Sequence, residues 1–366
     1  MKKILLLSGI LVFIVSCKDD SAPTAPAHPI LADSISIYFP PTTGGWETTS
    51  TSSLGWNTDS IAPLYTNLQA NGTRAFIVLK NGKIVVEKYW GKTLLGNADF
   101  DADKIWYWAS AAKTLTGFTV GKAEEEGHLN LSDNTSKYLG ENWTSLTKEQ
   151  QDKITVWHQL TMTSGLDDIR ADDTSAASLI YKSDAGTRWA YHNAPYTLLE
   201  RVVENATGQD YNTYFNTVLQ NKIGMTGYWQ WSEEIHLYLS NARSAARFGI
   251  LMQNNGVWDG TRLLNKEYLD ASIATSQQIN KAYGYLWWLN GSESYRVPQS
   301  QIEFPGMFLP DAPADVYSAM GKNGQYISIS PSNGLVIIRM GDSPDQSLVP
   351  LLYLNSIWKM TMGVID

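Results

Sequence analysis

The chain has 366 residues, of which 43% are hydrophobic and 17% are charged, a balance that is ordinary for globular proteins. The formal net charge of -8 and the lack of a basic stripe argue against a nucleic-acid partner. Because there is only one cysteine, no internal disulfide can form, and the fold must depend on its own hydrophobic core.

The first residues are typical of an export signal. Two lysines follow Met1, and the apolar segment 4–15 is too short for a permanent membrane span. The Ile-Val-Ser before Cys17 resembles the lipobox of bacterial lipoproteins, which are cleaved before a cysteine that is then lipidated. We therefore expect a signal peptide over 1–16 and a lipidated Cys17 with a Pro/Ala tether over 17–35. The alternative is an ordinary secretory signal with an incidental cysteine.

Residues 36–366 are expected to form a single domain, in which strands near both chain ends enclose a helical middle. The pattern predicts a strand hairpin over 71–90, helices over 110–126, 196–204, 211–221 and 243–254, strands over 325–330 and 335–340, and a helix over 349–360. This order indicates an α+β fold, with one sheet built from both chain ends, flanking helices and a mainly helical lobe.

The most informative segment is Ser110-Ala111-Ala112-Lys113, which follows an aromatic run. A serine three residues before a lysine places both side chains on one helix face. A serine hydroxyl attacks a carbonyl well only when a neighbour accepts its proton, and a lysine kept neutral by burial can accept it. Ser110 and Lys113 are therefore the candidate nucleophile and base.

A second copy of the Ser-x-x-Lys pattern joins Ser145 to Lys148. It lies in a polar stretch that is typical of a solvated helix start, so we interpret that copy as structural.

Tyr191-His192-Asn193 is the second motif. Its phenol can shuttle protons near a nucleophile, and its amide can orient the lysine and the substrate. The same Tyr-x-Asn spacing recurs at Tyr65 and Tyr353, so the motif is weak by itself.

The third motif, Lys322-Asn323-Gly324, can place a lysine beside a substrate carboxylate and a glycine where the backbone approaches closely. The same tripeptide at 80–82 is predicted to form a hairpin turn, because Asn-Gly suits a two-residue turn. Lys322 either binds a carboxylate or is a turn residue beside the site, and the sequence leaves both open.

In this order, the motifs resemble those of the penicillin-recognising serine hydrolases, which include β-lactamases, D-alanyl-D-alanine peptidases and related esterases and amidases. Residues 158–166 are similar to the His-x-Leu-x-x-x-Ser-Gly-Leu segment of that family. Tyr-x-Asn in place of Ser-Asp-Asn resembles the class C branch. Residues 38–41, 54–56 and 283–288 look most like the subgroup of 6-aminohexanoate-dimer hydrolases and esterases.

The resemblance implies a β-lactamase/transpeptidase-like antiparallel sheet and a covalent acyl-enzyme on the serine. It also implies an acid–base pair, and an oxyanion hole made by the backbone N–H groups of Ser110 and Gln325. The implied site consists of catalytic Ser110, Lys113 and Tyr191, with Asn193, Lys322, Gly324 and Gln325 binding the substrate.

Other candidates have simpler interpretations. We expect His158 to be structural, because the role of the base is already filled. The five histidines show no metal-ligand spacing, so no metal or other cofactor is expected. Four aromatic side chains are candidates for a cleft wall: Trp106, Trp108, Trp287 and Trp288.

The sequence thus predicts an exported serine hydrolase that cleaves a small ester or amide. We expect it to be lipid-anchored to a bacterial outer membrane, on the periplasmic side or the cell surface, with no protein partner implied. A D-alanyl-D-alanine peptidase or a β-lactamase is the alternative, and a penicillin-binding surface receptor that acylates without turnover is another.

Overall fold

The computed structural model describes residues 36–365, which belong to one compact unit. The predicted signal peptide, the lipidation site Cys17 and the tether lie outside the described residues. Within that range, every helix is too short or too polar to cross a lipid bilayer.

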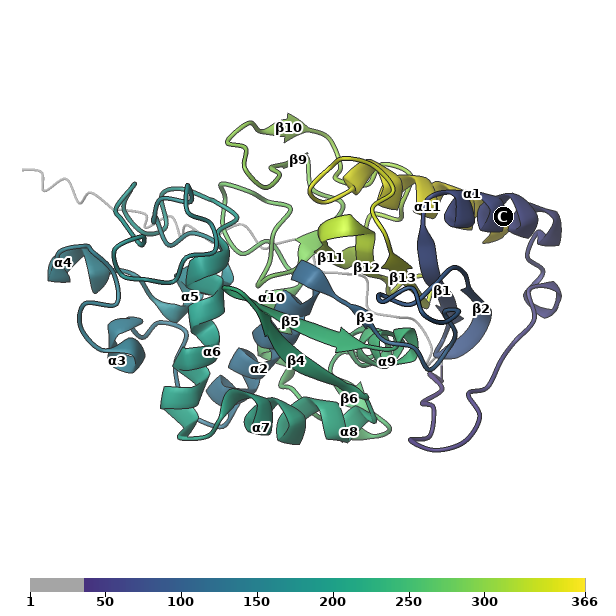
Figure 1. Cartoon of the computed structure of the whole chain (residues 1–366), viewed down its shortest axis with the longest axis horizontal. Coiled ribbons are helices and arrows are strands. Elements are labelled where there is room, and N and C mark those ends of the chain that lie inside the picture. The colour runs from purple at the N-terminus through teal and green to yellow at the C-terminus, as the bar shows by residue number, and fades with distance from the viewer. Residues whose placement is uncertain (1–35, 366) are drawn as a thin grey trace, which may run out of the picture. The chain divides into compact units, whose positions relative to one another are not determined.

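The centre of the fold is a six-stranded antiparallel sheet with the strand order β2-β1-β13-β12-β11-β8 (Figure 1). Its strands are β1 (Thr73–Lys80), β2 (Lys83–Tyr89), β8 (Trp288–Leu289), β11 (Tyr317–Gly321), β12 (Gln325–Ser330) and β13 (Leu335–Gly341). Because β1 from the start of the domain pairs with β13 from its end, the prediction of a sheet built from both chain ends is confirmed.

The two predicted hairpins of this sheet are present. The turn between β1 and β2 holds Asn81 and Gly82, both with left-handed backbone (φ 49° and 82°), which fits a turn that matches the twist of the strands. The turn between β12 and β13 is closed by Gly334, whose N–H donates to the carbonyl of Pro331 at 3.0 Å.

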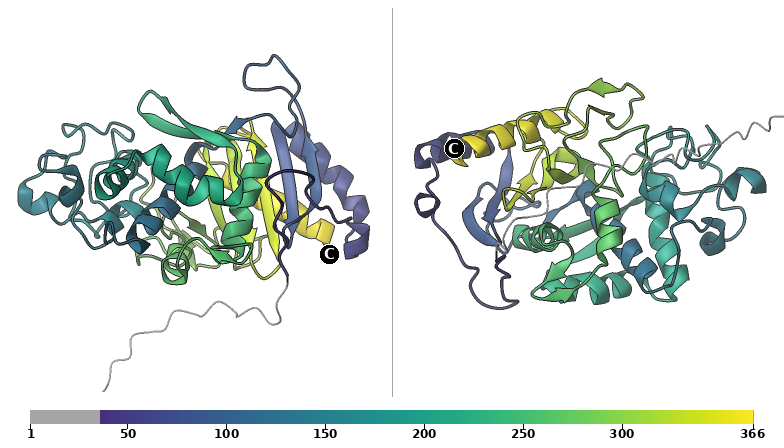
Figure 2. Two further views of the ribbon diagram at one scale, coloured as in Figure 1. Left: turned by 90° about the horizontal axis from the view of Figure 1, so that it is seen from below. Right: turned by 180° about the vertical axis from the view of Figure 1, so that it is seen from behind.

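Helices cover both faces of the sheet. On one face, Gly249 of α9 (Ala242–Gln253) approaches Val336 and Ile327 so closely that a Cβ there would lie 2.4 Å from the Val336 side chain. On the other face, the Trp358 indole of α11 (Leu351–Ile365) donates to Ser328 Oγ at 2.8 Å. Helix α1 (Ile61–Ala70) lies beside α11 (Figure 2). Burial of both faces explains why the strands are almost continuously apolar.

The helical middle of the chain packs around α2 (Lys113–Glu125), which continues the short 3-10 helix Ala109–Ala112 and matches the predicted helix. The helix predicted over 196–204 is longer, because α6 runs from Asn193 to Thr207. The helix predicted over 211–221 consists of α7 (Tyr211–Phe215), a π-helical turn and α8 (Asn221–Ile223). The remaining helices are α3 (Ser136–Leu139), α4 (Lys148–Gln151), α5 (Val156–Leu160) and α10 (Lys266–Ser272).

A second sheet, which the sequence analysis did not predict, lies beside the 3-10 helix Ala109–Ala112 that precedes α2. It has the strand order β3-β5-β4, with β3 (Trp106–Tyr107), β4 (Gly227–Ser232) and β5 (Ile235–Ser240). Strand β11 was not predicted either. Two small hairpins complete the strands, namely β6 (Val257–Trp258) with β7 (Thr261–Arg262), and β9 (Ser294–Tyr295) with β10 (Phe304–Pro305).

Candidate active site

Strand β5 holds one side of the segment around Ser110 through hydrogen bonds to Trp108. The N–H of Trp108 donates to the carbonyl of Tyr238 at 2.9 Å, and the Trp108 indole donates to Ser240 Oγ at 2.7 Å. Ala109 has a left-handed backbone with φ 47°, a conformation that costs a non-glycine residue about 1–2 kcal/mol. A strained residue directly before a candidate nucleophile fits the tendency of backbone strain to gather at functional sites.

The second side of this segment lies against Gly321, the last residue of β11. A Cβ at Gly321 would fall 2.5 Å from the carbonyl oxygen of Trp108 and 3.0 Å from the nitrogen of Ala111. The turn that follows is tied to the same region, because Asn323 Nδ2 donates to the hydroxyl of Tyr107 at 2.8 Å. Strand β11 and strand β5 therefore hold the start of α2 between them.

Lys113 lies one turn after Ser110, and its Nζ donates to Ser110 Oγ at 3.3 Å. The lysine is only 5% exposed, and its burial lowers its pKa to about 7. The carboxylates of Asp172 and Glu200 oppose that shift, because negative charge favours the ammonium form. Near neutral pH a large share of the amine is therefore unprotonated and able to accept a proton from Ser110.

Two tyrosine rings enclose the amine. Nζ of Lys113 lies 4.0 Å from the ring centroid of Tyr196 and 5.4 Å from that of Tyr191. The Tyr196 hydroxyl is held by Thr116 Oγ1 at 3.1 Å, so the ring keeps its face toward the lysine. These rings exclude water from the amine, which is the cause of its lowered pKa, and they also offer the charged form a cation–π contact.

Tyr191 is the third predicted catalytic residue, and it lies in contact with the first two. Burial raises the pKa of its phenol well above the ordinary value, and a hydrogen bond with Ser110 partly offsets that rise. Its ring stacks on Trp288, with centroids 5.8 Å apart at an angle of 20°. A protonated phenol in contact with Ser110 is placed to pass a proton to or from that oxygen.

Asn193 begins α6, and its amide nitrogen donates to Asp172 Oδ1 at 2.6 Å, not to Lys113. The Asn193 Oδ1 atom is buried and has no partner among the described residues. The predicted role of Asn193 in orienting the lysine and the substrate stays a prediction, because its contact here is with the Asp172 carboxylate.

Two carboxylates near the lysine were missed by the sequence analysis. Asp172 comes from the loop before α6. Glu200, on α6, is 4% exposed and binds His236 Nδ1 at 2.7 Å, and burial raises its pKa. Acidic residues on loops and amphipathic helices are common, so nothing in the local sequence distinguishes these two from solvated ones.

The third motif forms a turn, which is one of the two possibilities that the sequence left open for Lys322. Lys322 is exposed and belongs to the turn Lys322–Gly324 between β11 and β12, so it is not on a strand. Gly324 has φ 76°, and a Cβ there would lie 2.6 Å from Arg339 Nη1. The Gln325 side chain turns toward β13, where Nε2 donates to the carbonyl of Gly341 at 2.7 Å. Gly321, which the sequence analysis missed, is the residue of this region that lies against the Ser110 segment.

The duplicate motifs and His158 have structural roles. Ser145 Oγ donates to the carbonyl of Leu179 at 3.2 Å, and Lys148 is paired with Asp152 at 2.6 Å. His158 Nδ1 lies 2.8 Å from Thr155 Oγ1, in the cap of α5. The interpretation of the second Ser-x-x-Lys copy and of His158 as structural is confirmed. Over residues 36–365, no three His, Cys, Asp or Glu side chains are arranged to hold a metal ion.

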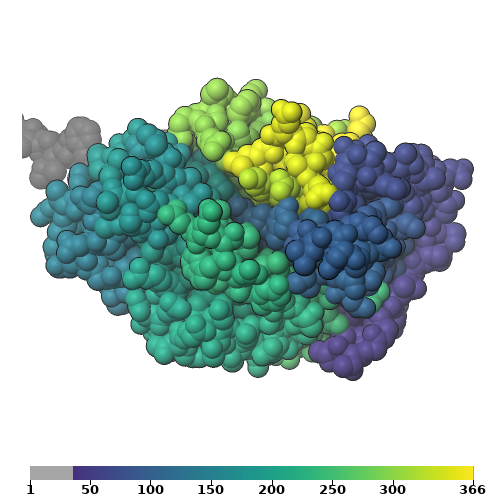
Figure 3. Space-filling view, viewed as in Figure 1, coloured from purple at the N-terminus to yellow at the C-terminus, as the bar shows by residue number. Residues whose placement is uncertain are grey.

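The four candidate tryptophans divide into two groups. Trp106, Trp108 and Trp287 are buried in the core at 1–2% exposure, whereas Trp288 also lines a cavity beside Tyr191. Figure 3 shows a hollow near the centre of one face, between teal residues on the left, green residues below and yellow residues at the upper right. A substrate approaches a nucleophile through such a concave surface.

The position of Gly321 gives a first prediction. Gly321→Ala is expected to reduce kcat/KM by about 100-fold, because the new Cβ would push the backbone on either side of Ser110 out of place. Gly321 has φ -131°, so alanine adds no backbone strain of its own. Ester hydrolysis by purified protein measures the effect.

The matched control is Gly363→Ala in α11, where a Cβ meets open space and activity is expected to stay unchanged. Full activity of Gly321→Ala would show that the Ser110 segment can move away from β11 without loss.

Comparisons with known proteins agree with this fold. A sequence profile described as Beta-lactamase matches residues 66–347. An uncharacterized protein of Alkalihalophilus pseudofirmus is 25% identical over 308 residues, covering 75% of this chain and 85% of that protein. The 6-aminohexanoate-dimer hydrolase of Paenarthrobacter ureafaciens is 23% identical over 326 residues, covering 76% and 74% of the two chains.

Among solved structures, a putative 6-aminohexanoate-dimer hydrolase from Bacillus anthracis superposes with a TM-score of 0.68 at 18% identity, over 90% of this chain and 89% of that chain. This likeness extends over the sheet and the helical region together, and it confirms the β-lactamase/transpeptidase-like α+β fold. Because the profile spans more than half of the chain, the protein belongs to the β-lactamase family of serine hydrolases.

Proposed function

We propose that this protein hydrolyses a small ester or amide through an acyl-enzyme on Ser110, with Lys113 and Tyr191 as the acid–base pair. The observation that carries the proposal is the 3.3 Å contact between Lys113 Nζ and Ser110 Oγ, made by an amine whose pKa burial lowers to about 7. A neutral amine beside a serine hydroxyl is the arrangement that activates a serine nucleophile.

In the first half of the reaction, Ser110 Oγ attacks the substrate carbonyl while its proton passes to Lys113. Tyr191, in contact with Ser110, then delivers a proton to the leaving alcohol or amine as the tetrahedral intermediate collapses to the ester of Ser110, and the Lys113 ammonium returns a proton to Tyr191. In the second half, water attacks that ester and gives a proton to Lys113. Tyr191 passes its proton to Ser110 Oγ as the acid leaves, and Lys113 reprotonates Tyr191, so all three side chains end as they began.

The negative oxygen of the intermediate needs two hydrogen-bond donors. The N–H of Ser110 is one. We place the second at the peptide after Gly321, because β11 lies directly against the Ser110 segment, whereas Gln325 is on the next strand, β12, where it pairs with Gly321. This assignment replaces the Gln325 donor that the family resemblance suggested.

Lys322 and the named relatives bear on the substrate class. An exposed Lys322 in a turn gives little reason to expect a bound substrate carboxylate, which a carboxypeptidase would need. The relative from Paenarthrobacter ureafaciens is named for an amide substrate, the 6-aminohexanoate dimer. That dimer is an amide but keeps a free amine and a free carboxylate, so it supports amide cleavage and not an uncharged substrate. Because Lys322 is exposed, small uncharged esters and amides are the first choice, ahead of D-alanyl-D-alanine peptides and β-lactams.

A panel of substrates on one preparation tests the proposal. We expect labelling by a fluorophosphonate, steady turnover of p-nitrophenyl acetate and little hydrolysis of nitrocefin or of a D-alanyl-D-alanine peptide. Faster hydrolysis of nitrocefin than of the ester would favour a β-lactamase. Labelling with one equivalent of product and no further turnover would identify a receptor that acylates without hydrolysis.

A further inference from the structure

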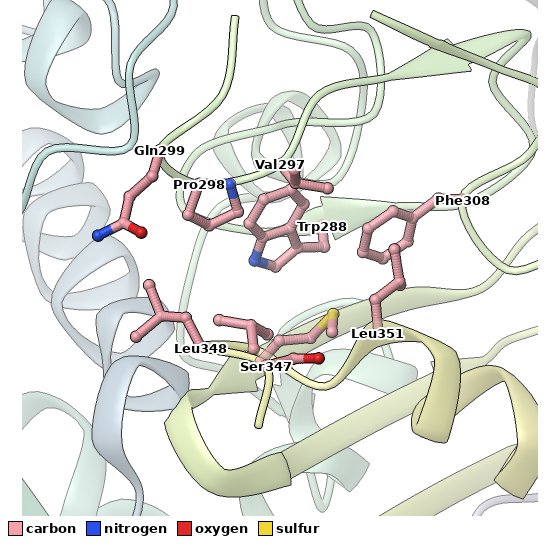
Figure 4. Close-up of a pocket in the computed structure, with 10 residues that line it drawn as sticks. Trp288, Val297, Pro298, Gln299, Phe308, Ser347, Leu348 and Leu351 are labelled. Carbon is pink, nitrogen blue, oxygen red and sulfur yellow. The ribbon is translucent and has the colours of Figure 1, made fainter. Parts of the chain in front are cut away.

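A cavity of about 330 Å³ opens in the described part of the chain, and most of the side chains in its walls are apolar (Figure 4). Its lining consists of Trp288, Val297, Pro298, Gln299, Phe308, Met320, Ser347, Leu348, Val349 and Leu351. No charged side chain is among them, and its volume lies within the range of pockets that bind small molecules. Figure 4 shows Trp288 and Phe308 on one side of the space, with Leu348 and Leu351 opposite.

The cavity adjoins the candidate active site at two points. The Trp288 ring stacks on Tyr191 at 5.8 Å, and it also stacks on Phe308 at 5.2 Å and 2°. Met320, in the lining of the cavity, directly precedes Gly321, which lies against the Ser110 segment. These two contacts place the cavity next to the residues that surround Ser110, which is not itself in the lining.

The side of the substrate that enters the cavity follows from the proton transfers. Tyr191 is the group that protonates the leaving alcohol or amine, so the leaving group lies on the Tyr191 side of the nucleophile. Trp288, which stacks on the Tyr191 ring, also lines the cavity, so the cavity lies on the leaving-group side.

We propose that the cavity binds an uncharged apolar substituent on the leaving alcohol or amine, and that the preferred substrates are esters or amides of apolar alcohols or amines. This inference rests on the proposed function of Ser110. A free carboxylate in the cavity would be desolvated with no cation to pair with, which disfavours peptide substrates that keep a C-terminal carboxylate there.

The test uses two ester series with the wild-type protein. In the first, acetate esters of ethanol, butanol and hexanol vary only the alcohol, and acid release is followed by titration. We expect kcat/KM to rise roughly fourfold for each methylene that becomes buried. In the second, p-nitrophenyl esters vary only the acyl chain from acetyl to hexanoyl, and we expect a much shallower dependence. A steep acyl series with a flat alcohol series, or two flat series, would overturn the inference.

A filling variant and a matched control separate the cavity from general effects. Val297→Trp is expected to reduce the hexyl-to-ethyl ratio of kcat/KM by about tenfold or more, because it occupies space that two or more methylenes need. Leu352→Trp introduces the same tryptophan at a position that is 80% exposed and outside the lining. This control should leave the hexyl-to-ethyl ratio unchanged. An unchanged ratio in Val297→Trp would count against the inference.

Two further measurements keep the outcomes distinct. If Val297→Trp does not fold, Leu348→Ser tests the same point, at a lining side chain that is 44% exposed. The rise of kcat/KM with alcohol length is expected to be smaller in this variant, and an unchanged rise would contradict the inference. Fluorophosphonate labelling of Ser110 reports on the proposed function separately. Labelling and acetate release without an alcohol-chain preference would leave the function standing and remove the inference. Absence of both would remove the function as well.

Discussion

Ser110→Ala is expected to abolish fluorophosphonate labelling and to reduce ester turnover by a factor on the order of 10⁴ or more, because no other nucleophile stands at this position. The hydroxyl is held in place by the hydrogen bond from Lys113 Nζ and by the contact with Tyr191. Removing one oxygen from a half-buried side chain leaves the packing of α2 unchanged, so thermal unfolding should stay close to that of the wild type. Intact-mass measurement after labelling gives the stoichiometry directly.

Ser145→Ala is the matched control, because Ser145 carries the same Ser-x-x-Lys spacing. Its hydroxyl donates to the carbonyl of Leu179, and the lysine three residues on is paired with Asp152. That variant should be labelled and should turn over ester as the wild type does. Labelling that survives in Ser110→Ala and disappears in Ser145→Ala would reverse the assignment of the nucleophile.

Much of the sheet could be predicted from the sequence because its signals are local. Asn81-Gly82 fixes the first hairpin, and long apolar strands at both chain ends predict one buried sheet. The Ser110–Lys113 pair could likewise be predicted, since residues three apart in a helix share a face. In each case the residues that interact are neighbours in the sequence, or belong to elements with strong periodicity.

The parts that could not be predicted depend on contacts between distant segments. In the sequence, nothing distinguishes Gly321 from other glycines. Only the fold shows that a Cβ at this position would lie 2.5 Å from the carbonyl oxygen of Trp108. Asp172 reaches Asn193 from a loop without periodicity, and its effect on the lysine is electrostatic. The Lys-Asn-Gly motif left Lys322 undecided for the same reason, because the same three residues can form a turn or part of a site strand.

Lys113→Arg is expected to reduce the rate of acylation by about 10²- to 10⁴-fold, which is the usual contribution of a general base. Arginine keeps the positive charge and much of the bulk of lysine, but it cannot lose its proton near neutral pH. Its buried charge is also costly, so Lys113→Met is the companion variant, uncharged and of similar length. Both should show this loss of rate in single-turnover acylation. Only Lys113→Met is expected to unfold at a temperature as high as the wild type or higher.

The pH dependence of the free energy of unfolding should also report on the buried amine of Lys113. The folded-state pKa of Lys113 is about 7, below the value of about 10.4 for the unfolded chain, so the unfolded state binds more protons between these two values. This group therefore makes folding stability rise with pH across that window, and Lys113→Met should lose that contribution. Denaturant unfolding at several pH values between 7 and 10 compares the two proteins.

The pH dependence of acylation is the sharpest test of the base. The neutral form of Lys113 becomes populated as pH rises through about 7, so the wild-type rate should climb on the acid side and level off above that value. Asp172 favours the charged amine, so Asp172→Asn should lower the pKa of Lys113 and move the rising limb to lower pH, with the Asn193 contact retained. The midpoint belongs to the coupled Lys113–Tyr191 pair, since both groups touch Ser110. If Lys113→Arg keeps most of the rate, or if Asp172→Asn moves the limb to higher pH, the base is a group other than Lys113.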